Sequence, residues 1–482
     1  MNSTDLLALL PLLLIAVTAI AVMLLIAIRR NHLLTAALTV IGFCAAFGTL
    51  FVAAPLAPRD VTPLLSIDST ALFYIGLILV ASVAVVFLCH GYFKHDEGSH
   101  PEELYLLIAI AALGSAVLVS ASHFAALFLG LEILSVALYG LISYARNTNA
   151  SVEVGLKYLV LAAASASFLL FGMAIVYFEL GTMTFRGVSA GMATQATDSA
   201  TMATAATLIV VGIGFKLGLV PFHMWTPDVY EGAPAPVAAF VATVSKGAMF
   251  ALLLRLFGRP EVRNSGSVLL VFSIIAIASM FAGNLLALFQ RNVKRILAYS
   301  SIAHLGYLVV AFEAGGALGR SAAAFYLVAY FATMLGAFGV VTVLSRPGDD
   351  LGDLEAYRGL FWRRPVLAGI FTVMLLSLAS IPLTAGFIGE FYLVAAGVSA
   401  SQWVLVIVLV VTSAIGLFYY LRIIGALYSR VPEPAADAFV PPRIGSHSLR
   451  WTLAVLTVVV IAIGCYPDPV LRLIQTMVVG TG

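Results

Sequence analysis

Long apolar runs separated by short polar segments occupy almost the whole chain. A helix needs about 20 apolar residues to cross a bilayer, and charged or proline-rich segments delimit fourteen such runs. The predicted spans lie near residues 5–28, 33–54, 70–92, 103–120, 122–144, 153–179, 204–221, 236–257, 266–289, 295–313, 321–345, 365–399, 402–428 and 450–475. The twelfth span joins a run that ends at 381 to a continuation that ends at 399. The pattern therefore predicts an all-α polytopic membrane protein with about 14 transmembrane helices.

Proline interrupts two of these spans. Pro221 stops the seventh apolar run, and a polar interval with His223, Asp228 and Glu231 follows before the next helix begins. Pro382 interrupts the twelfth span in a similar way. Proline removes a backbone donor and clashes with the preceding turn. Broken backbone is tolerated at membrane depth only where protein buries it or where it lines a water-filled cavity. We therefore expect both breaks to adjoin a polar path.

Four landmarks recur in the same order in the two halves of the chain. The matched pairs are Glu132 and His304, the segments that begin at Lys157 and Phe325, Pro221 and Pro382, and Arg255 and Arg422. Each offset corresponds to five helices, and an odd number of spans inverts the second copy relative to the first, as in many secondary transporters.

This recurrence predicts two inverted five-helix repeats with broken helices 7 and 12. Helices 4–8 form the first repeat at 102–258, and helices 9–13 form the second at 264–430. A three-helix segment at 1–101 precedes them, and the last helix lies at 449–482.

The composition supports a membrane protein and narrows its chemistry. Of the 482 residues, 62% are hydrophobic and 10% are charged, whereas soluble domains carry about 25% charged residues. The net charge of +2 gives no indication of a nucleic-acid partner. Cys44, Cys89 and Cys465 are scattered, and an iron–sulfur cluster needs about four cysteine ligands. No glycine-rich dinucleotide motif follows a strand. We expect no cofactor or metal in this chain.

The basic residues of the loops predict the orientation in the membrane. One side carries fourteen of them: Arg29, Arg30, Lys94, Arg146, Arg291, Lys294, Arg295, Arg346, Arg358, Arg363, Arg364, Arg430, Arg443 and Arg450. The other side carries seven: Arg59, Arg186, Arg255, Arg259, Arg263, Arg320 and Arg472. The side richer in lysine and arginine is cytoplasmic. Both termini are therefore expected in the periplasm.

A few ionisable residues fall inside the predicted spans, where charges are expensive and mark ion paths by default. They are Lys157, Lys216, Lys246, Arg422, Glu132, Glu390 and His304. Glu132 is too deep in its helix to reach the surface, and we expect it to pair with Lys216 as a proton site. Burial disfavours the charged form of a lysine, so Lys216 and Lys246 are expected to release and regain a proton. The alternative for all three is a permanent structural contact.

Four further residues are assigned to the same path, each with a structural alternative. Lys157 lies one turn into its helix beside Glu153, so an interfacial i,i+4 ion pair competes with a path role. His223 follows the first break and could relay protons or cap loop carbonyls. His304 lies in a polar strip suited to water, or is a satisfied core histidine. Glu390 follows the second break, where nothing close in sequence neutralises it.

Five motifs resemble the antiporter-like membrane subunits of respiratory complex I, along essentially the whole chain. They read LFLGLEILSVALYGL, GFKLGLVPFHMWTPDVYEGAPAPV, ATVSKGAMFALLLRL, NVKRILAYSSIAHLGYL and GFIGEFYL. The resemblance implies a fourteen-helix fold with proton-path residues at Glu132, Lys216, Lys246 and Glu390, and accessory positions at His304 and Lys157. One branch of the family commonly carries a lysine where this chain has Glu390.

The resemblance also implies partners, cofactors and a location. The partners are the lipid bilayer and other membrane subunits, including the neighbouring antiporter-like subunit M and small subunits such as K and J. Flavin, iron–sulfur clusters and quinone are expected in other subunits, and the location is the bacterial inner membrane. We therefore expect a proton-translocating subunit driven by redox chemistry elsewhere. The alternatives are a subunit of a multisubunit cation/proton antiporter of the Mrp type and a non-pumping structural subunit.

Overall fold

The structure is a computed structural model that describes residues 2–94, 100–145, 149–194, 200–258, 266–347, 350–430 and 447–480. Within these ranges thirteen helices are long and apolar enough to cross a bilayer, and two shorter apolar helices together form one more span. The predicted helical membrane fold is confirmed. Arg146, Arg259, Arg263 and Arg443, which entered the orientation count, lie outside the described residues, as do the predicted boundary at 264 and the last two residues.

The first half of the chain contains the N-terminal segment and the first broken span. Its helices are α1 (Ser3–Ala8), α2 (Leu10–Ile28), α3 (His32–Ala53), η1 (Ala54–Leu56), α4 (Ser69–Phe93), α5 (Glu102–Ser120), α6 (Phe124–Ile142), α7 (Asn149–Leu180), α8 (Phe185–Thr194), α9 (Ala200–Leu217), α10 (Trp225–Gly232), α11 (Ala235–Phe240), η2 (Val241–Ser245) and α12 (Lys246–Phe257). A small antiparallel pair, β1 (Arg59–Asp60) and β2 (Ser66–Ile67), precedes α4.

The second half contains the second broken span and the C-terminal helices. Its helices are α14 (Gly266–Leu288), α15 (Val293–Ala314), α16 (Gly316–Leu344), η3 (Leu354–Tyr357), α17 (Leu360–Arg363), α18 (Pro365–Leu378), α19 (Ala385–Ser399), α20 (Trp403–Tyr428), α22 (His447–Cys465), α23 (Asp468–Ile474) and η4 (Gln475–Val479). The last predicted span, 450–475, was too long. The helix ends at Cys465, and Pro467 caps a separate helix, α23.

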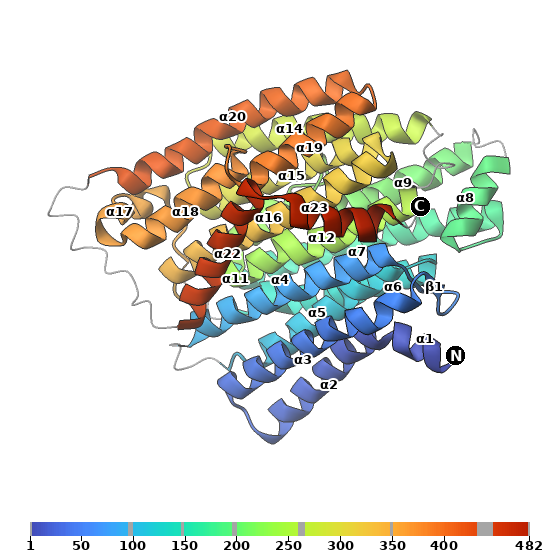
Figure 1. The fold of residues 1–482 in the computed structure, drawn as a ribbon, viewed down its shortest axis with the longest axis horizontal. Helices are drawn as coiled ribbons and strands as arrows, with labels where there is room; N and C mark the ends of the chain where they lie inside the picture. The colour runs from blue at the N-terminus through green and yellow to red at the C-terminus, as the bar shows by residue number, and fades with distance from the viewer. Residues whose placement is uncertain are drawn as a thin grey trace.

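The helices form one bundle with a polar centre enclosed by apolar helices. Figure 1 shows α2 and α3 at one edge and α14 and α20 at the opposite edge. The central spans are the most enclosed, since 94% of α11–α12, all of α15 and 94% of α16 are buried over an 18-residue window. For α2, α3 and α22 the buried share is 33%. Lys246 of α12 and His304 of α15 therefore lie deep inside protein.

The first break separates α9 from α10. The helix ends at Leu217, four residues before the predicted end at 221, because Gly218 adopts a positive φ of 74°. A Cβ at Gly218 would lie 2.5 Å from Thr226 Oγ1, so only glycine fits this turn. Ser279 of α14 satisfies one freed backbone group, since Val220 N donates to Ser279 Oγ over 2.9 Å. The expected break is confirmed, and protein covers part of it.

The second break separates α18 from α19 and is built differently. Ser380 and Leu383 both have positive φ, 52° and 71°, which non-glycine residues rarely adopt. The hydroxyl of Ser377 accepts a bond from Gly386 N over 3.1 Å and so anchors the start of α19. Strained backbone of this kind persists where the surroundings hold it in place and often lies at functional sites. The second break is also confirmed.

Candidate functional site

Lys216 lies at the C-terminal end of α9, and its side chain points into the protein. The residue is 4% exposed. Its ammonium donates to Ser135 Oγ over 2.6 Å and lies 3.5 Å from the hydroxyl of Tyr158, whose ring centroid is 5.3 Å away. No carboxylate of the described residues lies within 4.0 Å of this nitrogen in an ion pair. The groups that bind the ammonium of Lys216 are therefore neutral hydroxyls.

Glu132 is on α6 but does not form the direct ion pair expected with Lys216. Instead, the ammonium of Lys216 donates a hydrogen bond to Ser135, which lies three residues further along the same face of α6. Glu132 is only partly buried, and within the described part of the chain its Oε1 atom is enclosed without a hydrogen-bond partner. The carboxylate therefore lies on the same helix as the serine that binds Lys216, without a direct bond to the ammonium.

Lys246 begins α12, directly after a π-helical turn at Val241–Ser245. Such turns often occur at functional sites. The residue is 1% exposed, and its ammonium donates to Ser301 Oγ over 2.8 Å. The rings of Tyr230 and Trp225 lie 5.3 and 5.9 Å from the nitrogen. Among the described residues it also has no carboxylate in ion-pair range.

Two aromatic rings lie between the lysines. Tyr158 contacts Lys216, Trp225 contacts Lys246, and the two ring centroids are 4.9 Å apart. The indole of Trp225 donates to Phe215 O over 2.8 Å, which ties the short helix α10 back to α9. The two ammonium groups are therefore separated by π faces, which attract cations without accepting a proton.

His304 of α15 contacts hydroxyl groups with both ring nitrogens. Nδ1 contacts the hydroxyl of Tyr326 from α16, and Nε2 lies 3.0 Å from that of Tyr420 from α20. Tyr420 in turn lies 2.6 Å from Ser300 Oγ. Ser301, the partner of Lys246, is three residues before His304 on the same helix, so these two groups share a face. Both nitrogens of the imidazole therefore have hydrogen-bond partners. This fits a place in a proton path and also a satisfied core histidine.

Glu390 of α19 lies at the second break, where two serines bind its carboxylate. Ser380 from the break and Ser413 from α20 both donate to Oε2, the latter over 3.1 Å. A Cβ on the preceding residue, Gly389, would lie 3.0 Å from Tyr326 Cδ2. Tyr326 therefore packs between the imidazole of His304 and the helix that carries Glu390. Glu390 itself is partly exposed, unlike the two lysines.

The structure places the other two predicted residues at the margin of this group. Lys157 pairs with Glu153 over 2.6 Å, and the side chains are 54% and 63% exposed, so the interfacial ion pair is favoured over a place in the path. His223 is 8% exposed and lies in the first break. Within the described residues neither of its ring nitrogens bonds to a side chain, which leaves both the relay and the capping hypotheses open.

A further buried lysine, Lys294, was assigned to a loop in the sequence because it lies at the start of a helix. Lys294 is 1% exposed, pairs with Asp350 over 2.5 Å and donates to Ala233 O over 2.7 Å. Its neighbour Arg295 binds Asp228 and Glu231 of α10 over 3.0 and 2.7 Å. These bonds hold the broken segment against α15. Asp228 and Glu231 therefore have a structural contact with α15.

Hydroxyl groups contact the two lysines, His304 and Glu390. They are Ser135, Tyr158, Ser301, Tyr326, Tyr420, Ser380 and Ser413. Ser301 belongs to the polar strip around His304 that the sequence indicates, whereas only the packing of distant helices identifies the other six. In the described residues no cluster of three or more His, Cys, Asp or Glu could hold a metal ion.

Comparison with known proteins identifies the family. Residues 121–416, more than half of the chain, match the family described as "NADH:quinone oxidoreductase/Mrp antiporter, TM". The chain belongs to this family. The matched segment contains both lysines, Glu132, His304 and Glu390, and the family resemblance found in the sequence is confirmed.

One relative shows to which branch of the family the chain belongs. The NADH-quinone oxidoreductase subunit N of Ectopseudomonas mendocina (strain ymp) is 51% identical over 481 residues, covering 98% of this chain and 97% of the relative. This chain is therefore a family member of the subunit N type.

Two solved structures are similar to this chain. A chain of respiratory complex I from Thermus thermophilus with bound aureothin superposes with a TM-score of 0.81 at 33% identity, covering 96% of this chain and 98% of that one. A chain of the Mrp complex from Dietzia sp. DQ12-45-1b reaches 0.85 at 20% identity, covering 98% and 96%. The second likeness shows a shared fold alone.

Proposed function

We propose that this chain is a proton-translocating membrane subunit of NADH:quinone oxidoreductase, the translocase known as respiratory complex I. The relative that is 51% identical along nearly the whole chain carries the name of subunit N of that enzyme. The buried titratable groups supply the chemistry, and redox reactions in other subunits supply the energy. Moving one charge against a membrane potential costs about 2.3 kcal/mol per 100 mV, which is the energy that those reactions have to provide.

One observation carries the proposal. Lys216 and Lys246 are buried in the membrane interior, yet their hydrogen-bond partners are neutral serine hydroxyls. Structural charges inside proteins are normally paired, as Lys294 is with Asp350. An ammonium group held only by neutral partners can lose its proton without leaving an uncompensated carboxylate next to it. This arrangement suits a proton carrier better than a permanent ion pair.

The order of the groups suggests a route. Redox energy released at a distant quinone site changes the hydration and charge pairing around Glu132 and Lys216. The proton on Lys216 then moves to Lys246 and His304 and reaches Glu390, from which it leaves on the periplasmic side. Tyr326 and Ser301 lie along this route and can pass protons between neighbouring groups.

The same proposal covers partners, cofactors and location. The partners are other membrane subunits of the complex, with an antiporter-like subunit M and small subunits such as K and J as neighbours. Flavin, iron–sulfur clusters and quinone are bound by other subunits. The chain lies in the bacterial inner membrane with both termini in the periplasm, because the loops after helices 1, 3, 5, 9, 11 and 13 carry the excess of lysine and arginine.

The test replaces Lys216 by a neutral residue of similar length. In Lys216→Met we expect proton pumping by the reconstituted complex to fall about tenfold or more, since a positioned acid–base group contributes about 10²–10⁴-fold to a proton transfer. Flavin content and subunit composition should not change. Lys157→Met is the matched control, since its exposed ion pair is worth less than about 1 kcal/mol. Full pumping by Lys216→Met would refute the route.

A subunit of a cation/proton antiporter is the second candidate, because the Mrp complex shares the fold. Purification of the assembly from its host decides between them. Flavin and iron–sulfur absorbance that co-purify with the chain support complex I, and their absence supports the antiporter.

A structural subunit is the third candidate. It predicts that Glu132→Gln harms assembly as much as activity, whereas a proton path predicts an assembled complex with reduced pumping.

A further inference from the structure

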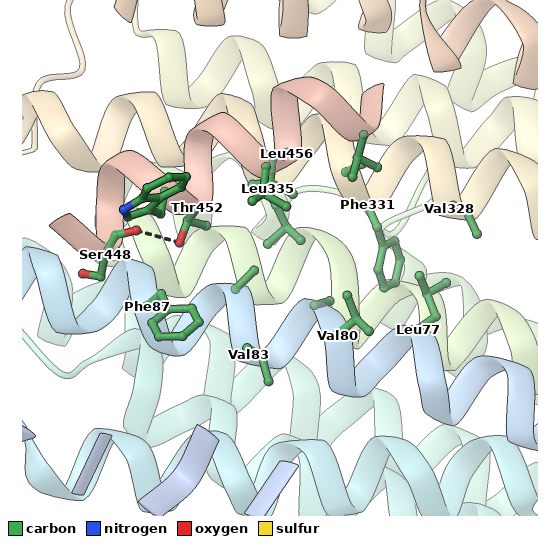
Figure 2. A pocket seen from close by; sticks show the side chains of 16 residues that line it. Leu77, Val80, Val83, Phe87, Val328, Phe331, Leu335, Ser448, Thr452 and Leu456 are labelled. Carbon is green, nitrogen blue, oxygen red and sulfur yellow. Dashed lines mark hydrogen bonds between the residues drawn. The ribbon is translucent and has the colours of Figure 1, made fainter. Parts of the chain in front are cut away.

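An apolar groove opens on the outer surface of the bundle between α4, α16 and α22 (Figure 2). Its volume of about 520 Å³ lies within the usual range for pockets that hold a small organic ligand. The floor is α16, where Phe331 and Leu335 are 2% and 3% exposed. Val80 of α4 and Val455 of α22 form the rims and are more than half exposed. The groove is therefore open to the lipid that surrounds the protein.

The groove has the length of one leaflet of a bilayer. Along α4 it extends from Leu77 to Phe87, ten residues that rise about 15 Å in a helix. The hydrocarbon core of a bilayer is about 30 Å thick, so this distance is half of it. An extended acyl chain that enters beside Ser448 and lies along α4 past its midpoint fits this shape.

Each of the three helices brings a cation to the same end of the groove. Lys94 follows α4, Arg346 lies two residues after α16, and Arg450 is in the first turn of α22; all three residues are exposed. Contacts hold these helix ends together. A Cβ at Gly91 would lie 2.3 Å from Leu449 Cγ, so α4 and α22 touch there. The hydroxyl of Tyr92 donates to Arg346 O over 2.9 Å, which joins α4 to the end of α16.

The other polar features at this end also suit a lipid headgroup. Trp451 is 71% exposed beside the groove, and tryptophan is enriched at the membrane–water interface. The nearby carboxylate of Asp350 already pairs with Lys294 over 2.5 Å, so its charge is compensated.

We propose that this groove is a binding site for an anionic phospholipid. One acyl chain lies along α16 between α4 and α22, and the phosphate lies among Lys94, Arg346 and Arg450. Basic pockets between transmembrane helices bind anionic headgroups on the cytoplasmic side, and the loops at this end are the ones we assign to that side.

The bound acyl chain would contact the floor of the groove one side chain away from Lys246. A Cβ at Gly247 would lie 2.3 Å from Phe331 Cζ, so this ring packs directly on α12 beside the lysine. An acyl chain in the groove would therefore add contacts to the outer side of a ring that packs on α12 next to Lys246. This last step rests on the proposed function, whereas the binding of the lipid does not.

The experiment measures lipid retention by the purified, intact complex. The complex is delipidated, placed in nanodiscs of phosphatidylcholine with or without phosphatidylglycerol, and analysed by native mass spectrometry for lipid that stays bound. Lys94→Gln and Arg346→Gln should each weaken the retention of phosphatidylglycerol about fivefold. Arg29→Gln, an exposed cation on the same membrane face, should retain it like the parent complex.

A second pair of variants tests the groove itself. Ala84→Trp fills the groove from α4 and should abolish retention, whereas Val458→Trp places the same ring on the exposed surface of α22 outside the groove and should not. Should Ala84→Trp fail to assemble, a photo-crosslinking p-benzoylphenylalanine in place of Val83 decides the point.

The outcomes are distinguishable. A lipid adduct at position 83 together with loss of retention in the charge variants supports the site. A crosslink to another protein subunit would show that a helix fills the groove and would overturn the proposal. Equal retention of both lipids by all variants would also overturn it. Because retention is measured separately from pumping, a loss of pumping without a loss of lipid would count against the proton route and not against this site.

Discussion

The two broken spans differ in backbone geometry and lie next to charged groups of opposite sign. The break between α9 and α10 lies between two lysines that are 4% and 1% exposed. The break between α18 and α19 holds the carboxylate of Glu390, which is partly exposed. In both places serine hydroxyls bind the charged group, and within the described ranges no opposite charge lies in ion-pair range of it. The two lysines are therefore enclosed in the bundle, whereas the acid lies nearer its surface.

The largest expected effect comes from the most enclosed base. Lys246→Met should reduce proton pumping about tenfold or more and leave the complex assembled, because its partner, Ser301, is neutral. Lys294→Met is the informative contrast. It leaves the carboxylate of Asp350 with the Tyr92 hydroxyl but without its cationic partner, and a buried charge that loses its counter-charge costs about 3–5 kcal/mol. Pumping assays and subunit composition together should separate the two, and equal loss of assembly would break the distinction.

The acid at the second break should matter next. Glu390→Gln keeps the size of the side chain and can still accept bonds from Ser380 and Ser413, but it cannot accept a proton. We expect pumping to fall about tenfold with normal assembly. Glu390→Asp is the control that retains the acid. If Glu390→Gln pumps as well as Glu390→Asp, the partly exposed carboxylate is structural and the comparison between the breaks loses its functional meaning.

The hydroxyl between the two regions should have a smaller effect. Tyr326→Phe removes the bond to His304 Nδ1 while the ring still packs against Gly389. A single hydrogen bond contributes about 1 kcal/mol, which corresponds to about a fivefold change. Turnover and pumping measured at several membrane potentials would reveal this loss. An unchanged Tyr326→Phe complex would indicate that protons bypass this tyrosine.

The smallest effects concern the backbone of the two breaks. Gly218→Ala introduces a Cβ where φ is 74° and Thr226 is 2.5 Å away, and we expect a loss of about 1–2 kcal/mol in stability. Leu383→Gly relieves a positive φ of 71° at an exposed site and should be neutral or stabilising by up to about 1 kcal/mol. Thermal denaturation of the purified complex compares the two. Equal destabilisation would show that Leu383 contributes packing that outweighs its strain.

The local features of this protein were predictable because their physics is local. Apolar runs of membrane-spanning length define the helices, and proline at 221 and 382 marks both breaks. Charged residues inside such runs are rare and costly, so Lys216, Lys246 and Glu390 could be identified without a structure. The overlong last span was an avoidable error, since Pro467 was visible in the sequence.

The hydrogen-bond partners of each ionisable residue depend on the packing of helices that are distant in sequence. Ser135 lies 81 residues from Lys216, and Tyr420 lies 116 residues from His304. A local sequence pattern cannot reveal contacts between residues so far apart in the chain. The fold also directed Lys157 to the surface and set Ser135, not Glu132, against the ammonium of Lys216. The sequence by itself thus determined which residues can carry charge inside the membrane. The tertiary structure alone decided their neighbours, because only packing brings separate helices into hydrogen-bond distance.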